Sequence, residues 1–225
     1  VDPADITYPV SQAITLRLTT NDPDGPTGPC VAVADDVVVT INEAAKVVAP
    51  ASLEMCEKQT GAPISTSIAL GAVQSGAITT ATWTTTGAGT FSNINDPNAR
   101  YFYSHPSEVN QIIPLVITVS DPDGLGPCTS NSDTVRVKVN PLPIVDFVTL
   151  PFQIAENNLP ITLNGNQSGG LFTIQPASSN IGSTTQTPLD KVVFDPSAAT
   201  LGTNFITYTY TIPATGCVNN VVKQI

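Results

Sequence analysis

The feature that most constrains this chain is a short stretch that occurs twice. The first copy reads Asp22-Pro23-Asp24-Gly25 followed by Gly28-Pro29-Cys30, and the second reads Asp121-Pro122-Asp123-Gly124 followed by Gly126-Pro127-Cys128. Cys30 and Cys128 are 98 residues apart. An internal period of this length is typical of tandem small domains, and it is close to the size of an immunoglobulin-like sandwich, about 100 residues. The repeat therefore predicts small domains of one kind in series.

Each copy lies between two runs in which apolar and polar residues alternate. Residues 14–19 and 37–42 flank the first copy, and residues 112–119 and 134–139 flank the second. Alternation with a period of two marks a strand with one buried face, so we expect each repeat to end in a two-stranded hairpin. Further strands are expected at residues 64–70, 80–86, 100–103, 206–211 and 221–225.

The whole chain is predicted to be all-β. Its 20 Pro and 15 Gly suit many short strands separated by turns, and no stretch of helical length keeps a 3.6-residue period. We expect a first repeat at residues 1–42 that is the C-terminal half of a truncated domain, and a complete second repeat at 43–140. A Pro-rich linker follows at 141–143, and a divergent third repeat at 144–225. An isolated hairpin is marginal in water, so the first repeat should be the least stable part.

The charge of the chain argues against two classes of partner. The net charge is -10, with 8 Lys plus Arg against 18 Asp plus Glu. Nucleic acid and anionic membranes both need a basic face, so neither is expected to bind. No apolar run approaches the roughly 20 residues of a membrane-spanning helix, so direct membrane insertion is not expected.

Catalysis is not expected either. His105 is the sole histidine, and it precedes Pro106 in a turn where the third repeat has Asp195-Pro196. A Ser-His-Asp or Cys-His arrangement would have to use His105. The sequence has no Gly-x-Ser-x-Gly elbow, zinc spacing, phosphate loop or dinucleotide fingerprint. We therefore expect His105 to be a turn residue and the chain not to be an enzyme.

The two aspartate turns carry the sharpest hypothesis about a site. In each, two carboxylates are separated by one residue, and a third returns on the next strand. With nearby carbonyls they would supply much of the shell of roughly six to eight oxygens that calcium takes. Asp, Pro and Gly are also ordinary turn formers, and EF-hand spacing is lacking, so a plain turn is the alternative. The candidate calcium ligands are Asp121, Asp123 and Asp133, with Asp22, Asp24 and Asp35 as their first-copy equivalents.

The four cysteines allow more than one pairing. Cys56 lies near the start of the second repeat and Cys128 in its last turn, so a Cys56–Cys128 disulfide would pin the first strand to the final hairpin. Cys30 is the equivalent of Cys128, and its partner is expected upstream of residue 1. Cys217 has no evident mate in its own repeat. The alternative is four buried thiols of a cytosolic protein, but disulfides are typical of secreted sandwiches of this size.

The order of motifs in the second repeat resembles a known family. Cys56 is followed by Thr82-Trp83-Thr84-Thr85-Thr86-Gly87, then by Tyr103-x-x-Pro106-Ser107, and finally by the Asp-Pro-Asp-Gly to Cys turn. This order resembles the PKD/immunoglobulin-like repeats of very large Bacteroidota surface proteins, which include gliding adhesins exported by type IX secretion. The third repeat resembles a sister repeat, with Gly169-Gly170-Leu171-Phe172 and Gly216-Cys217.

The resemblance implies tandem immunoglobulin-like or PKD-like antiparallel β-sandwich domains in an elongated array. It also implies an extracellular, outer-membrane-associated location, with neighbouring repeats of the same chain as direct partners. Surface polysaccharide or another substratum would be bound by other parts of the protein. Asp133-Thr134-Val135 resembles the O-glycosylation motif of that phylum, which would place a glycan on Thr134.

The expected function is mechanical: a stalk or filament that serves surface adhesion and, as the resemblance implies, gliding. The alternative is a carbohydrate-binding module of a secreted hydrolase. Such a module needs an exposed aromatic platform, for which Tyr101, Phe102 and Tyr103 are the candidates. In an alternating strand one or two of these rings must point inward.

Overall fold

The computed structural model describes residues 11–58, 67–78, 80–120, 128–151, 153–177, 179 and 191–225. The regular structure of these residues is almost entirely strand, as predicted, with a short 3-10 turn at Pro196–Ala198. None of their helical segments is long and apolar enough to cross a membrane.

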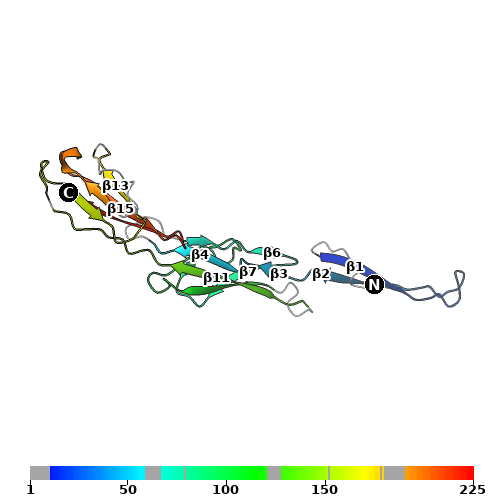
Figure 1. Ribbon diagram of the computed structural model, residues 1–225. Helices are drawn as coiled ribbons and strands as arrows, with labels where there is room; N and C mark the ends of the chain where they lie inside the picture. Colours follow the sequence, from blue (N-terminus) through cyan, green and yellow to red (C-terminus); the bar gives the residue numbers. More distant parts are fainter. Residues whose placement is uncertain are drawn as a thin grey trace. The chain divides into compact units, whose positions relative to one another are not determined.

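The chain divides into two compact units, both built of strands (Figure 1). The first contains Val1–Leu53, Ile68–Phe102 and Ile113–Val137, and the second contains Glu54–Ser67, Tyr103–Ile112 and Lys138–Ile225. The second repeat contributes to both units. The division at residues 1–42, 43–140, 141–143 and 144–225 stays a prediction about repeats.

The first repeat forms the predicted hairpin. Strand β1 (Ser11–Thr19) pairs antiparallel with β2 (Ala34–Asn42), and Leu16 lies opposite Val37. Opposite residues share a face, so the alternation places most of the larger aliphatic side chains on one side. Leu18 is 75% exposed and Val37 is 56% exposed, so this face is open to solvent. The residues on this face are Ile14, Leu16, Leu18, Val37, Val39 and Ile41.

The equivalent hairpin of the second repeat has the same pattern and is buried. It consists of β10 (Ile112–Val119) and β11 (Asn131–Asn140), which are neighbours in one sheet. Its core-facing residues are at most 3% exposed; they are Ile113, Leu115, Ile117, Val135, Val137 and Val139. The alternation in sequence is therefore the same in both copies, and the strands that cover it make the difference in burial.

The second repeat is a sandwich. One sheet has the order β4 (Ser52–Cys56), β11, β10, β7 (Ala81–Thr85). The remaining strands form two small sheets: β3 (Lys46–Val48) with β6 (Val73–Ser75), and β5 (Ser67–Ala69), β9 (Arg100–Phe102) and β8 (Thr90–Phe91).

Large side chains fill the core of this sandwich. Trp83 is 2% exposed, and its Nε1 donates a hydrogen bond to the carbonyl of Asp96 at 2.9 Å. Phe91 stacks beside it, and Tyr101 packs on Phe91 with ring centroids 5.3 Å apart. Trp83 is thus a buried core residue whose polar atom has a hydrogen-bond partner.

Strand β4, which no pattern in the sequence predicted, runs parallel to β11. The amide of Arg136 donates to the carbonyl of Ala51, and the amide of Glu57 donates to the carbonyl of Asn140. Both strands therefore advance together, and the end of β4 lies beside the end of β11. This direction determines which end of the repeat carries Cys56.

The third repeat packs around Phe147, Phe172 and Tyr208, all nearly buried. Its strands are β12 (Ile161–Asn164) paired with β14 (Lys191–Phe194), and β13 (Leu171–Gln175), β15 (Phe205–Thr211) and β16 (Val218–Gln224) in one sheet. The predicted strand at residues 206–211 and the last hairpin are confirmed.

Candidate functional site

The candidate site is the junction where the second repeat meets the linker and the third repeat. Cys56, the last residue of β4, is bonded to Cys217, which directly precedes β16. The two Cα atoms are 5.5 Å apart, and Cys217 is fully buried. The disulfide therefore links the second repeat covalently to the third.

The predicted Cys56–Cys128 pairing is wrong, for a geometric reason. Cys56 lies beside Asn140 at the end of β11, whereas Cys128 lies three residues before β11 begins. Ten extended residues at about 3.3 Å each span about 30 Å, and a disulfide needs Cα atoms within about 7 Å. Cys128 is half-buried and lies outside this disulfide.

Glu57 connects three segments at the junction. Its amide donates to the carbonyl of Asn140 at 2.8 Å. One carboxylate oxygen lies 2.7 Å from Nε2 of His105, and the other accepts the amide of Leu142 at 3.1 Å. One side chain thus holds the turn at His105 and the linker against the end of β4. His105 lies in a turn, as expected, and its partner is Glu57.

The linker is held from both sides. The amide of Leu142 bonds Glu57, and the carbonyl of Pro143 accepts Nδ2 of Asn219 at 2.9 Å. Asn140, which is 3% exposed, donates from its Nδ2 to the carboxylate of Glu54 at 2.9 Å. Polar side chains of both repeats therefore fix residues 140–143 in addition to the disulfide.

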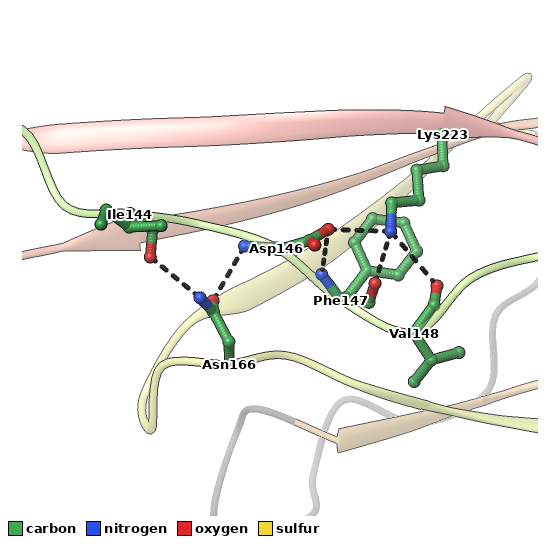
Figure 2. Close-up of polar contacts among 6 residues, drawn as sticks. All are labelled: Ile144, Asp146, Phe147, Val148, Asn166 and Lys223. Carbon is green, nitrogen blue, oxygen red and sulfur yellow. Dashed lines mark hydrogen bonds and ion pairs between the residues drawn. The ribbon is translucent and has the colours of Figure 1, made fainter.

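A lysine anchors the segment that follows the linker (Figure 2). Nζ of Lys223 on β16 lies 2.8 Å from Oδ1 of Asp146 and donates to the carbonyl of Phe147. The same ammonium lies 4.6 Å from the centroid of the Phe147 ring. The hydrogen bond from Lys223, and then that from the Phe147 amide, hold the pKa of Asp146 below its ordinary value.

Asn166 holds the same segment from its other side, as Figure 2 shows. Its Nδ2 donates to the carbonyl of Ile144 at 3.0 Å, and its Oδ1 accepts the amide of Asp146 at 2.8 Å. Residues 144–147 are therefore clamped between β16 and the turn that carries Asn166. No motif in the sequence marked this clamp, because its members are scattered along the chain.

The first aspartate turn binds its own backbone. Oδ1 of Asp22 accepts the amide of Asp24, and Oδ2 of Asp24 accepts the amide of Cys30 at 3.2 Å. The Cys30 amide is the main cause that lowers the pKa of Asp24. Asp35 accepts the amide of the next residue in β2.

The predicted calcium set in this first turn is therefore not assembled. Nowhere in the described part of the chain do three or more His, Cys, Asp or Glu side chains gather as metal ligands. Asp22, Asp24 and Asp35 instead serve backbone hydrogen bonds. Asp121 and Asp123 lie outside the described residues, so a calcium site there stays a prediction.

Asp133 also has a structural role. Its Oδ2 accepts the amide of Ala49 at 2.8 Å, and its Oδ1 accepts the amide of Thr134 at 2.7 Å. These two bonds, that from Ala49 first, lower the pKa of Asp133. The carboxylate thereby ties the segment after β3 to β11. Thr134 is half-buried in β11, and its glycosylation stays a prediction.

Replacing Asp133 by Asn is expected to destabilise the second repeat by about 1–2 kcal/mol near neutral pH, because one charge-assisted hydrogen bond is lost. The folded pKa of Asp133 lies below its ordinary value of 3.8. The charged carboxylate therefore contributes stability above that value, and the contribution disappears as the pH falls through the folded pKa. Urea unfolding should show a gap between wild type and D133N that shrinks below pH 3.8.

The matched control is Asp35→Asn, at the equivalent position of the first repeat. Its carboxylate accepts the adjacent amide of Asp36, and no hydrogen bond from it to a second strand is found among the described residues. Its effect should stay within about 0.5 kcal/mol. A D133N gap that is independent of pH would contradict the assigned role.

The three candidate aromatic residues do not form an exposed platform. Tyr101 is fully buried in the core. Phe102 and Tyr103 are half-buried, and the Tyr103 hydroxyl accepts the amide of Lys58. One ring of the three points inward, as alternation requires, and the other two are partly covered. These residues therefore give no support to a carbohydrate-binding module.

Comparison with known proteins finds similarity to solved structures at low identity. No protein-family model and no curated protein matches the chain. Among solved structures, protocadherin gamma B2 extracellular cadherin domains 3–6 share 11% identity with a TM-score of 0.34, covering 96% of this chain and 58% of that chain. Mouse cadherin-23 EC22–24 shares 12% with a TM-score of 0.31, covering 82% and 66%. The human desmocollin-1 ectodomain shares 11% with a TM-score of 0.37, covering 87% and 45%.

The fold is an immunoglobulin-like β-sandwich. This assignment rests on the sheets of the chain itself. At TM-scores of 0.31 to 0.37 the likeness to these structures carries no argument about fold, ligands or partners. This chain spans 58%, 66% and 45% of the lengths of those three chains.

Proposed function

We propose that this chain is a structural segment of a secreted cell-surface adhesin, in which tandem sandwiches form a stalk or filament. The observation that carries the proposal is the Cys56–Cys217 disulfide, which fastens one repeat to the next. A stalk needs junctions that resist bending. Disulfides persist in oxidising surroundings, so the same bond supports an extracellular location.

The polar contacts of the junction support the same proposal. Glu57, Asn140 and Asn219 satisfy backbone or side-chain groups on both sides of the linker. A flexible tether between independent binding modules would gain nothing from such contacts. The Lys223 clamp continues the ordered path into the third repeat.

The finer part of the proposal rests on the motif resemblance. It places the parent protein among the large outer-membrane-associated surface proteins of Bacteroidota, most like the gliding-motility adhesin SprB, exported by type IX secretion. In this proposal the direct partners are neighbouring repeats of the same chain. Other parts of the protein bind polysaccharide or substratum, and this segment has no catalytic role.

Small-angle X-ray scattering tests the stalk. The oxidised chain should give a narrow distribution of overall dimensions. The double variant C56S/C217S should give a broader one, because the linker alone then connects the repeats. The matched control is C30S, which alters an exposed thiol outside the junction and should leave the profile unchanged.

Identical profiles for the oxidised chain and the double variant would remove the main support for a stiffened stalk. A glycan array probed with the oxidised chain distinguishes a structural spacer from a carbohydrate-binding module. Specific binding of a polysaccharide to this segment would favour a carbohydrate-binding module over a spacer.

A further inference from the structure

Three of the four cysteines lie at equivalent positions, one in each repeat. Each lies in the loop between the last two strands and shortly before the last strand. Cys217 directly precedes β16, Cys128 lies three residues before β11, and Cys30 lies four residues before β2. We call these the late cysteines, and Cys56 at the end of β4 the early cysteine.

The direction of the strands places the two kinds of cysteine at opposite ends of a repeat. The last strand runs from the late cysteine to the end where the chain leaves the repeat, and β11 does so over ten residues. The early cysteine lies at that far end, because the Glu57 amide bonds the Asn140 carbonyl. The about 30 Å between the two ends exclude a bond between the early and late cysteines of one repeat.

The bonded pair follows this geometry. Cys56 lies at the end of the second repeat where the chain leaves it. Its partner Cys217 lies at the end of the third repeat where the chain enters it. Asn219, two residues after Cys217, bonds the linker carbonyl of Pro143, which confirms which end this is. The observed disulfide thus joins an early cysteine to the late cysteine of the repeat that follows.

We propose that the early cysteine of each repeat bonds the late cysteine of the repeat that follows, and that Cys30 is the late cysteine of such a disulfide. Its partner is an early cysteine at the end of a β4-like strand in a preceding repeat. Cys30 is an exposed thiol, and its amide is held by the Asp24 carboxylate. Cys128 has the same place in its hairpin, so the same rule gives it an early cysteine of the repeat before its own.

The bond forms by thiol–disulfide exchange. The two thiols lose two protons and two electrons as the new sulfur–sulfur bond forms, and an exchanging disulfide is reduced to two thiols. The third repeat has a late cysteine but no cysteine in residues 144–216. It can therefore form a disulfide with the repeat before it, but it has no early cysteine for a disulfide with a repeat after it. This pairing is independent of what the stalk binds.

A tandem duplication tests the rule. The full chain is extended so that residues 1–140 are followed by residues 43–225, which places one complete second repeat before another. Lys58→Arg in the first copy gives its Cys56 peptide a distinct mass. After oxidation with glutathione disulfide and alkylation, peptides are mapped without reduction.

Two cross-links are expected: Cys56 of the first copy with Cys128 of the second, and Cys56 of the second copy with Cys217. Cys128→Ser in the second copy should make Cys56 of the first copy fully alkylated. The same substitution in the first copy should leave both cross-links in place. A Cys56–Cys128 link within one copy, or loss of either expected link in the parent duplication, would overturn the rule.

Discussion

When the chain is pulled from its two ends, the fully extended length of the oxidised chain is expected to be about 55 nm shorter than that of the reduced chain. The reason is the separation of 161 residues between Cys56 and Cys217. Once residues before Cys56 and after Cys217 are stretched, the load passes through the disulfide. The residues between the two cysteines are then shielded from the force.

Single-molecule force spectroscopy measures this directly. The chain is attached through tags at both termini and pulled with and without a thiol reductant. The variant C217S should behave like the reduced chain in both conditions, and C30S should behave like the oxidised wild type. Equal contour lengths for oxidised wild type and C217S would contradict the load path.

The shielding has a consequence for a stalk. In the oxidised chain the force acts on the third repeat only through β16. Most of the second repeat lies within the loop that the disulfide closes, so the force does not act on it. The residues between Cys56 and Cys217 therefore do not extend under tension while the disulfide is intact. A protein that is pulled repeatedly would therefore gain little length per event.

Replacing Val137 by Asp is expected to unfold the second repeat, at a cost of about 4 kcal/mol or more, because it buries an unpaired charge. Val137 is fully buried on β11. The matched control is Val39→Asp, which changes the equivalent valine 98 residues earlier. Val39 is 41% exposed on the open face of the hairpin, so its effect should stay within about 0.5 kcal/mol.

Thermal and urea unfolding, followed by the fluorescence of Trp83, compare the two variants. Trp83 lies in the core of the second repeat, so it reports V137D directly. Circular dichroism adds the contribution of the first hairpin for V39D. Equal destabilisation by the two substitutions would show that the first hairpin is covered in solution.

Local patterns predicted much of the fold. The alternation at residues 14–19, 112–119 and 206–211 gave strands in β1, β10 and β15, because a half-buried strand imposes its period on the sequence. The short strands β3, β4, β6, β8, β12, β13 and β14 were not predicted. They have two to five residues, too few for a period to appear.

The candidate site was predicted in part. The sequence drew attention to Cys56 and Cys217, but it gave the wrong partner for Cys56. Glu57 and Lys223 had no signal, because a single charged residue becomes a clamp only through the segments it contacts. Asp22 and Asp24 of the first turn resembled part of a calcium-ligand set, but their carboxylates accept backbone amides of the same turn.

By itself the sequence determined that this protein is all-β, that its last-hairpin motif occurs twice with a spacing of 98 residues, and that a cysteine accompanies each copy. These are properties of local pattern and spacing, which each segment carries alone. Tertiary structure decided which cysteine bonds which, because that depends on β4 running parallel to β11 and so on which end of the repeat Cys56 occupies. Strand direction is set by packing over the whole repeat, and no single stretch of the sequence records it.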